Sequence, residues 1–269
     1  MTIRSIIATL FVVIQFFGPA AMAGQRVLVQ STTSTENSGL YRHILPMFMA
    51  ETGIRVDVVA VGTGQAIRNA SQGDADVLLV HSKADEEAFV AAGHGLLRHD
   101  LMYNDFVIVG LESDPAEVAG MPLNKALSQL AARQAVFVSR GDDSGTHKKE
   151  RALWATVGEM PEGSWYRETG SGMGASLRVA IEMGAYILTD RGTWIAFQDK
   201  GDHQIMVEHD PALFNQYGLI AVNPERHAHV NGEGAAVFVD WLVGEQGQAA
   251  IAGYRVDGQQ LFFPNAAVK

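Results

Sequence analysis

Ser139-Arg140-Gly141-Asp142-Asp143-Ser144-Gly145-Thr146-His147 follows an apolar run at 136–138 and precedes a helical pattern. This order predicts a strand, a polar glycine turn and a helix N-terminus. The free backbone N–H groups and the positive dipole end of such a helix bind anions. Ser144 and Thr146 add hydroxyl donors, and Arg140 adds a forked cation. The segment therefore predicts capture of a small oxyanion by hydrogen bonds, with no evident catalytic base.

Apolar runs and helical patterns alternate along the rest of the chain. This alternation predicts an α/β fold, in which mostly parallel sheets carry helices on both faces. The strand expected at 106–110 marks entry into a second lobe, and the strand at 219–222 marks the return. We therefore expect lobe I at 24–104 and 209–269 and lobe II at 105–208. Because no linker composition separates the lobes, the chain should cross between them more than once.

Three further turns have the same chemistry as the first. Five hydroxyl residues, 31–35, follow the first expected strand, and capping of the next helix needs only one of them. Gly62-Thr63-Gly64 follows the second strand, although a plain turn explains it equally well. The glycine-rich 169–174 also precedes a helix, but its glycine spacing and the lack of an evident strand before it argue against a dinucleotide site. Their recurrence predicts one anion held between two lobes, where open α/β sheets bind ligands.

The ends and the composition indicate an exported protein. Residues 1–23 carry one charge, Arg4, an apolar run and the small-residue pattern Ala21-Met22-Ala23, which predicts a cleaved signal peptide. The chain has no cysteine, so disulfides and lipid attachment at the cleavage site are excluded. We expect a periplasmic protein without a lipid anchor.

The charge balance restricts the partners. The net charge of −10, which becomes −11 when Arg4 is removed with the leader, argues against nucleic acid and anionic membranes as partners. Nine scattered histidines show no metal-ligand spacing, so neither a metal site nor another cofactor is predicted. Ser144 lacks the nucleophile-elbow pattern, and His147 has no evident orienting partner. We therefore expect no catalytic residues, and an exported hydrolase using Ser144 or His147 is a distant alternative. A third alternative is a sensory or adhesion module of the same fold that binds no ligand.

Together these motifs resemble the tungstate-binding periplasmic proteins of ABC importers. The resemblance runs in order through essentially the whole chain after the leader, including the segment from Tyr186 to Thr193. It implies a two-lobed type II periplasmic binding protein that holds its ligand in the cleft between lobes and delivers it to the membrane permease. It also implies a monomer. Carried over by motif, the ligand-binding residues would be Thr32, Thr33, Ser34 and Thr63 from lobe I, with Arg140, Ser144, Thr146 and backbone N–H groups near Gly145 and Met173 from lobe II.

Molybdate and phosphate receptors of the same fold are the alternatives. Residues 140–146 also fit the Arg-x-Asp-x-Ser-Gly-Thr pattern of phosphate receptors, in which the first aspartate pairs with the arginine. A phosphate site at neutral pH needs a carboxylate facing the anion to accept its proton, and the second turn, 61–65, has none. Tungstate and molybdate carry no proton at that pH, so a site made only of donors suits them. Asp142, Asp143 and Glu36 remain possible acceptors, which leaves phosphate open.

Overall fold

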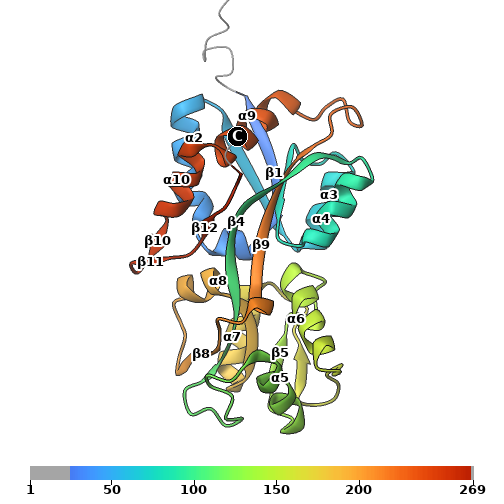
Figure 1. The fold of residues 1–269 in the computed structure, drawn as a ribbon. Coiled ribbons are helices and arrows are strands. Elements are labelled where there is room, and N and C mark those ends of the chain that lie inside the picture. The colour runs from blue at the N-terminus through green and yellow to red at the C-terminus, as the bar shows by residue number, and fades with distance from the viewer. Residues whose placement is uncertain (1–24, 268–269) are drawn as a thin grey trace, which may run out of the picture.

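The computed structural model describes residues 25–267, so the predicted signal peptide lies outside the described residues. Two lobes are stacked end to end, and two long strands, β4 (Gly95–Leu111) and β9 (Phe214–Val222), run between them (Figure 1). The predicted α/β architecture is confirmed. None of the helices at 25–267 is long and apolar enough to cross a membrane.

The upper lobe of Figure 1 is built around β1 (Arg26–Thr32), which lies between two parallel neighbours, β2 (Arg55–Val61) and β3 (Val77–Val80). The sheet's apolar side chains are buried under helices on both faces, around Phe48 and Phe238 on one face and Phe89 on the other. The remaining elements of this lobe are α1 (Thr33–Asn37), α2 (Leu40–Thr52), α3 (Thr63–Ser71), α4 (Lys83–Ala91), α9 (Gly232–Val243), α10 (Glu245–Gly253), β10 (Arg255–Val256), β11 (Gln259–Gln260) and β12 (Phe263–Pro264).

The lower lobe repeats this plan around β5 (Phe137–Ser139). Its parallel neighbours are β6 (Tyr166–Glu168) and β7 (Tyr186–Asp190). Two apolar clusters fill the two sides of the sheet, one around Trp154 and one around Leu177. The other elements are α5 (Leu123–Ala132), α6 (Gly145–Thr156), α7 (Met173–Met183), α8 (Arg191–Ala196), β8 (His203–Val207) and the short 3-10 helix η2 (Pro211–Leu213).

The two connecting strands make the sheet mixed. Residues 95–105 of β4 pair antiparallel with β9, and residues 106–111 pair antiparallel with β7 and β8. The parallel pairings therefore lie toward the two ends of the molecule and the antiparallel pairings in its middle. The sequence predicts only 106–110 as a strand, because polar residues interrupt the alternation between Arg98 and Asp105. The lobe boundaries given above stay a prediction.

The expectation that no strand precedes the 169–174 turn is wrong. β6 ends at Glu168, pairs with β5 and leads directly into this turn. Its three side chains are half-buried or exposed, so no apolar run marks it in the sequence. All four hydroxyl- and glycine-rich turns thus lie at the carboxyl ends of parallel strands.

Candidate functional site

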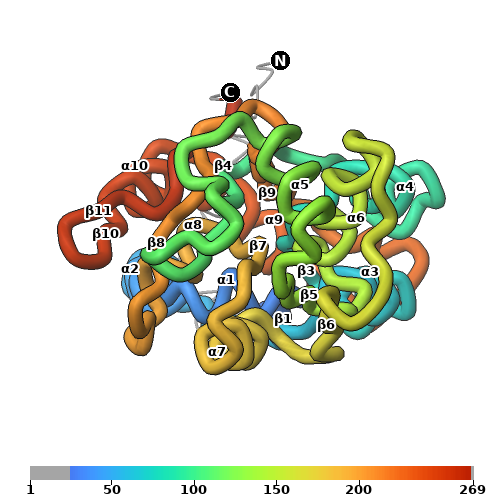
Figure 2. The backbone as a smooth tube through the Cα atoms, turned by 90° about the horizontal axis from the view of Figure 1, so that it is seen from below, coloured from blue at the N-terminus to red at the C-terminus, as the bar shows by residue number. Residues whose placement is uncertain are grey.

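The four predicted turns meet between the lobes. Helix α1 of the upper lobe contacts α7 of the lower lobe, and Figure 2 shows the two near each other. On the other side of the cleft, Figure 1 shows α6 of the lower lobe below α3 and α4 of the upper lobe. The backbone N–H of Gly145, at the start of α6, donates to Thr63 Oγ1 of α3 over 3.0 Å. A methyl group on Gly172, which precedes α7, would lie 3.6 Å from Thr33 Oγ1 of α1. The lobes are therefore in contact across the cleft.

The upper lobe contributes the hydroxyl residues after β1. Thr32 is the N-cap of α1, and its Oγ1 lies 2.8 Å from Thr35 Oγ1 and 3.0 Å from Ser34 Oγ. Ser31 bonds away from the cleft, to Tyr41 and to the backbone oxygen of Leu79. The Thr33 Oγ1 atom differs from these, because it is buried and has no hydrogen-bond partner among the described residues. Among the five hydroxyls of 31–35 it is the one left free for a ligand.

Thr63 completes the upper half of the site. It is fully buried and is the first residue of α3, after Gly62, which provides no side-chain cap. Because its Oγ1 accepts the Gly145 N–H, its own hydroxyl proton is free to be donated elsewhere. The backbone N–H of Gly145, predicted from the sequence to bind the ligand, already donates to Thr63 in this arrangement.

Arg140 lies at the end of β5 and is only 3% exposed. Its Nη2 donates to Asp142 Oδ2 over 2.5 Å, and its Nε donates to the backbone oxygen of Ser171 over 3.3 Å. Asp142 Oδ1 in turn accepts the Ser144 N–H over 3.2 Å. The aspartate pairs with the arginine, as the phosphate-receptor pattern implies. It fixes the orientation of the guanidinium, and the guanidinium N–H groups that do not bond Asp142 or Ser171 remain available as donors.

The start of α6 provides the next two predicted residues. Ser144 is the N-cap, and its Oγ accepts the His147 N–H over 3.2 Å, which explains this hydroxyl without a ligand. Among residues 25–267, Thr146 Oγ1 is buried and has no hydrogen-bond partner, and the same holds for Ser139 Oγ at the end of β5. Thr146, at the start of α6, therefore matches Thr33 in the first lobe.

Met173 begins α7. Its side chain packs in the core of the lower lobe, so any contact with an anion would come from its backbone. The N-cap of α7 is Gly172, which provides no side-chain bond to the first turn of the helix. Tyr186 from the quoted motif is instead buried, and its hydroxyl donates to Asp114 at the far end of the lobe.

Two more side chains lie beside the hydroxyls of α1: His81, which no sequence motif marks, and Thr193, which ends the motif at 186–193. His81 directly follows β3, and its Nε2 lies 3.3 Å from Ser34 Oγ. Thr193 Oγ1 lies 3.4 Å from the backbone oxygen of Ser34 and donates to Asp190 over 2.6 Å. His81 occupies the carboxyl end of a parallel strand, the same rule that identified the four turns, so its position in the sequence held a usable signal.

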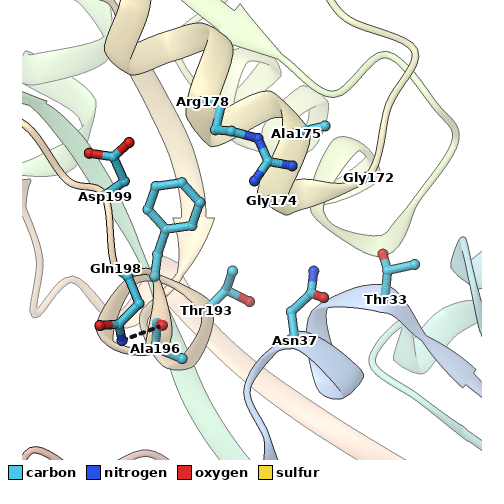
Figure 3. A pocket seen from close by; sticks show the side chains of 11 residues that line it. Thr33, Asn37, Gly172, Gly174, Ala175, Arg178, Thr193, Ala196, Gln198 and Asp199 are labelled. Carbon is cyan, nitrogen blue, oxygen red and sulfur yellow. Dashed lines mark hydrogen bonds between the residues drawn. The ribbon is translucent and has the colours of Figure 1, made fainter.

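A cavity of about 490 Å³ opens beside the converging turns, between α1, α7 and α8. Figure 3 shows Thr33, Asn37 and Thr193 on one side of this cavity and the Arg178 side chain reaching over the other. Thr33 and Gly172 belong both to the cavity wall and to the turns. The cavity is therefore continuous with the proposed anion position.

Each of the three candidate acceptors for a ligand proton has other contacts in the structure. Asp142 is held by Arg140 and the Ser144 N–H. The Asp143 side chain is 67% exposed beside Lys148. Glu36 lines a groove with Arg42 and Pro46 on α2. The converging groups are donors.

Burial shifts the pKa values of two ionisable groups near the cleft. Burial lowers the pKa of His81 to about 4, with Arg140 adding to the effect, so the imidazole is neutral at neutral pH. Burial raises the pKa of Asp190, although hydrogen bonds from Thr193 oppose the rise. Within residues 25–267 no group of three or more His, Cys, Asp or Glu side chains could hold a metal ion.

The geometry gives no support to a serine hydrolase. His147 Nδ1 accepts the N–H of Asp143 over 3.1 Å, and its Nε2 lies 3.8 Å from Glu168. The contact between Ser144 and His147 runs through the backbone N–H of the histidine and not through its ring. A general base must reach the nucleophile's proton, which this ring does not do.

Comparisons with known proteins agree on one family. The model of the PBP superfamily domain matches residues 19–246. The tungstate-binding protein TupA of Peptoclostridium acidaminophilum is 50% identical over 246 residues, covering 90% of this chain and 86% of that protein. The structure of TupA from Desulfovibrio alaskensis G20 is 45% identical, with a TM-score of 0.78 over 91% of this chain and 100% of that one. The tungstate ABC transporter structure from Geobacter sulfurreducens is 46% identical, with a TM-score of 0.80 over 86% and 100%.

Proposed function

We propose that this chain, which belongs to the tungstate-binding TupA family of the PBP superfamily, captures tungstate and delivers it to the membrane permease of an ABC importer. The fold is that of a type II periplasmic binding protein. The proposal includes a periplasmic location, release from a signal peptide, a monomeric state and the absence of catalytic activity. The names of the relatives from Peptoclostridium acidaminophilum and Desulfovibrio alaskensis, both tungstate-binding proteins, support it.

The observation that carries the proposal is that two buried threonine hydroxyls, each in the first turn of a helix at the cleft and one on each lobe, have no partner among the described residues. Thr33 Oγ1 and Thr146 Oγ1 each leave a polar group unsatisfied, which costs about 1–3 kcal/mol apiece. An oxyanion between them would accept both protons. The free Thr63 proton and the remaining N–H groups of Arg140 complete a set drawn from both lobes.

The choice among oxyanions follows from the lack of a facing carboxylate. Phosphate carries a proton in part of its population at neutral pH and would leave that proton unpaired here. Tungstate and molybdate are unprotonated dianions, and every oxygen can accept a hydrogen bond. Their size and charge are nearly equal, so the preference for tungstate over molybdate rests on the family. Molybdate is the second candidate ligand.

The test is calorimetric titration of the protein, without its leader, with tungstate, molybdate, phosphate and sulfate at neutral pH. We expect tight binding of tungstate or molybdate and far weaker binding of phosphate. Sulfate is also unprotonated but has shorter bonds to oxygen, so it separates the effect of size from that of protonation. A Thr33→Val, Thr146→Val double variant is the matched control for binding at this site. Preference for phosphate would show that a carboxylate faces the ligand and would overturn the proposal.

A further inference from the structure

A chain of buried side chains connects the proposed anion site to the two strands that join the lobes. Asn215 on β9 donates through Nδ2 to Asn104 Oδ1 on β4 over 2.7 Å, and these two residues are register partners. Asn215 Oδ1 lies 3.0 Å from His81 Nδ1, and His81 Nε2 lies 3.3 Å from Ser34 Oγ. All four side chains are buried.

The direction of each bond in this chain can be worked out from its anchored end. The Asn215 amide is oriented by two contacts of its nitrogen, which donates to Asn104 Oδ1 over 2.7 Å and to Tyr217 Oη over 3.2 Å. This orientation leaves Asn215 Oδ1 as the acceptor for a proton on His81 Nδ1. Because a neutral imidazole carries one proton, His81 Nε2 is an acceptor and the Ser34 hydroxyl donates to it.

We propose that His81 is a positioning residue, which fixes the Ser34 hydroxyl by accepting its proton and ties it to the Asn104–Asn215 pair of the connecting strands. This rests on the proposed function of the site. The Ser34 hydroxyl then supports the array and does not itself donate to the anion. With its proton directed at His81, Ser34 Oγ can accept from Thr32 Oγ1 3.0 Å away.

The His81 ring also lies where the lobes touch. It stacks on Tyr217 of β9 with ring centroids 5.0 Å apart, and a methyl group on Gly145 of the lower lobe would lie 3.0 Å from its Cε1. The ring therefore contacts a connecting strand, the hydroxyl array and the start of α6 at once. Movement of the lower lobe away from the upper would remove one wall of this packing.

Two substitutions of His81 each keep one of the two hydrogen bonds of the imidazole and remove the other. In His81→Asn the amide nitrogen takes the place of Nδ1 and keeps the bond to Asn215, but nothing accepts the Ser34 proton. In His81→Gln the amide oxygen reaches the place of Nε2 and keeps the bond from Ser34, but the bond to Asn215 is lost. We expect His81→Asn to weaken tungstate binding about fivefold or more, the effect of one hydrogen bond. His81→Gln should stay within about twofold of the wild type.

A double-mutant cycle with Ser34→Ala completes the test. If His81 acts through Ser34, His81→Asn and Ser34→Ala together should bind no more weakly than the weaker of the two single variants. Additive losses, equal effects of the Asn and Gln variants, or an unchanged affinity in His81→Asn would overturn the inference. Thermal unfolding without ligand should show each variant folded. If the wild type itself does not bind tungstate, the proposed function fails; if it binds and the His81 variants do not differ, only this inference fails.

Discussion

The backbone N–H of Gly145 bonds Thr63 Oγ1 over 3.0 Å and so joins the start of α6 to the start of α3 across the cleft. A methyl group on Gly145 would lie 2.9 Å from that same oxygen and 3.0 Å from the His81 ring. These separations are shorter than side chains tolerate. The glycine is therefore required by the close approach of the lobes.

Gly145→Ala should consequently fold normally and bind poorly. Gly145 is a helical residue at the start of α6, so alanine fits the backbone itself. The added methyl group clashes only when the lobes meet, and overpacking of this kind costs about 1–3 kcal/mol, or roughly 5- to 150-fold in affinity. Calorimetry with tungstate and thermal unfolding without ligand measure the two effects. Gly253→Ala, where a methyl group meets nothing within 4 Å, is the control. A Gly145→Ala variant with wild-type affinity would show that the ligand binds without this contact.

Thr33→Val and Thr146→Val should each lower the affinity for tungstate without lowering the free energy of unfolding of the ligand-free protein. Valine matches threonine in shape and removes a buried hydroxyl that has no partner in the protein. The free energy of unfolding without ligand should therefore stay equal or rise, while tungstate affinity falls by about 1–3 kcal/mol. Thr52→Val, which removes a hydroxyl bonded to the backbone oxygen of Phe48, should show the opposite pattern. Lower stability of the ligand-free Thr33 and Thr146 variants would mean that these hydroxyls already have a structural partner.

These predictions also show which features could be read from the sequence. The turns at 31–35, 62–64 and 140–147 were recognisable because hydroxyls and glycines follow apolar runs. The sequence could not show which hydroxyl of 31–35 is free for a ligand. That depends on the partner of each oxygen in the fold: Ser31 bonds Tyr41, Thr32 bonds Thr35, and Thr33 has no partner among the described residues. The first half of β4 was also missed. Its Arg98 pairs with buried Glu86 from α4, a long-range contact that no local periodicity reveals.

Arg140→Lys should weaken tungstate binding by about 1.5 kcal/mol or more, although the charge is kept. The lysine ammonium cannot reproduce the planar fork that bonds Asp142 and Ser171 while leaving N–H groups for an anion. Titration calorimetry is the measurement. The matched control is Arg133→Lys, which changes the arginine that caps the end of α5 in the lower lobe and pairs with Glu117. An affinity within twofold of the wild type would place Arg140 outside the site.

The ion pair between Lys148 of α6 and Asp85 of α4 joins the lobes at 2.6 Å, and both side chains are about one-third exposed. Lys148→Met should weaken binding by only about 0.2–1 kcal/mol, because exposed pairs contribute little. The loss should shrink as salt is raised from 10 to about 500 mM, since screening already weakens the wild-type pair. The exchange variant Asp85→Lys, Lys148→Asp should recover most of the affinity. A loss independent of salt would indicate that Lys148 packs against the other lobe without acting through its charge.

The buried carboxyl of Glu150 should make the free energy of unfolding depend on pH. It lies on α6, is 3% exposed and accepts a hydrogen bond from Tyr166 over 2.6 Å. Burial raises the pKa of this carboxyl from its ordinary value of 4.5 to about 7. Between these values the folded state binds the proton more tightly than the unfolded chain, so stability falls as pH rises. Its contribution is complete below about pH 4.5 and is lost above about pH 7.

Glu150→Gln keeps an acceptor for Tyr166 and carries no charge at any pH. Relative to the wild type, the variant should gain stability as pH rises from 5 to 8, by up to about 3 kcal/mol. Urea unfolding at pH 5, 6, 7 and 8 measures the difference, and Glu159→Gln, at an exposed position, should show none of this trend. A constant difference between Glu150→Gln and the wild type across this range would mean that the buried carboxyl does not titrate there. The tungstate affinity of the variant should match that of the wild type at every pH, because Glu150 bonds Tyr166 behind β5 and does not reach the donors of the cleft.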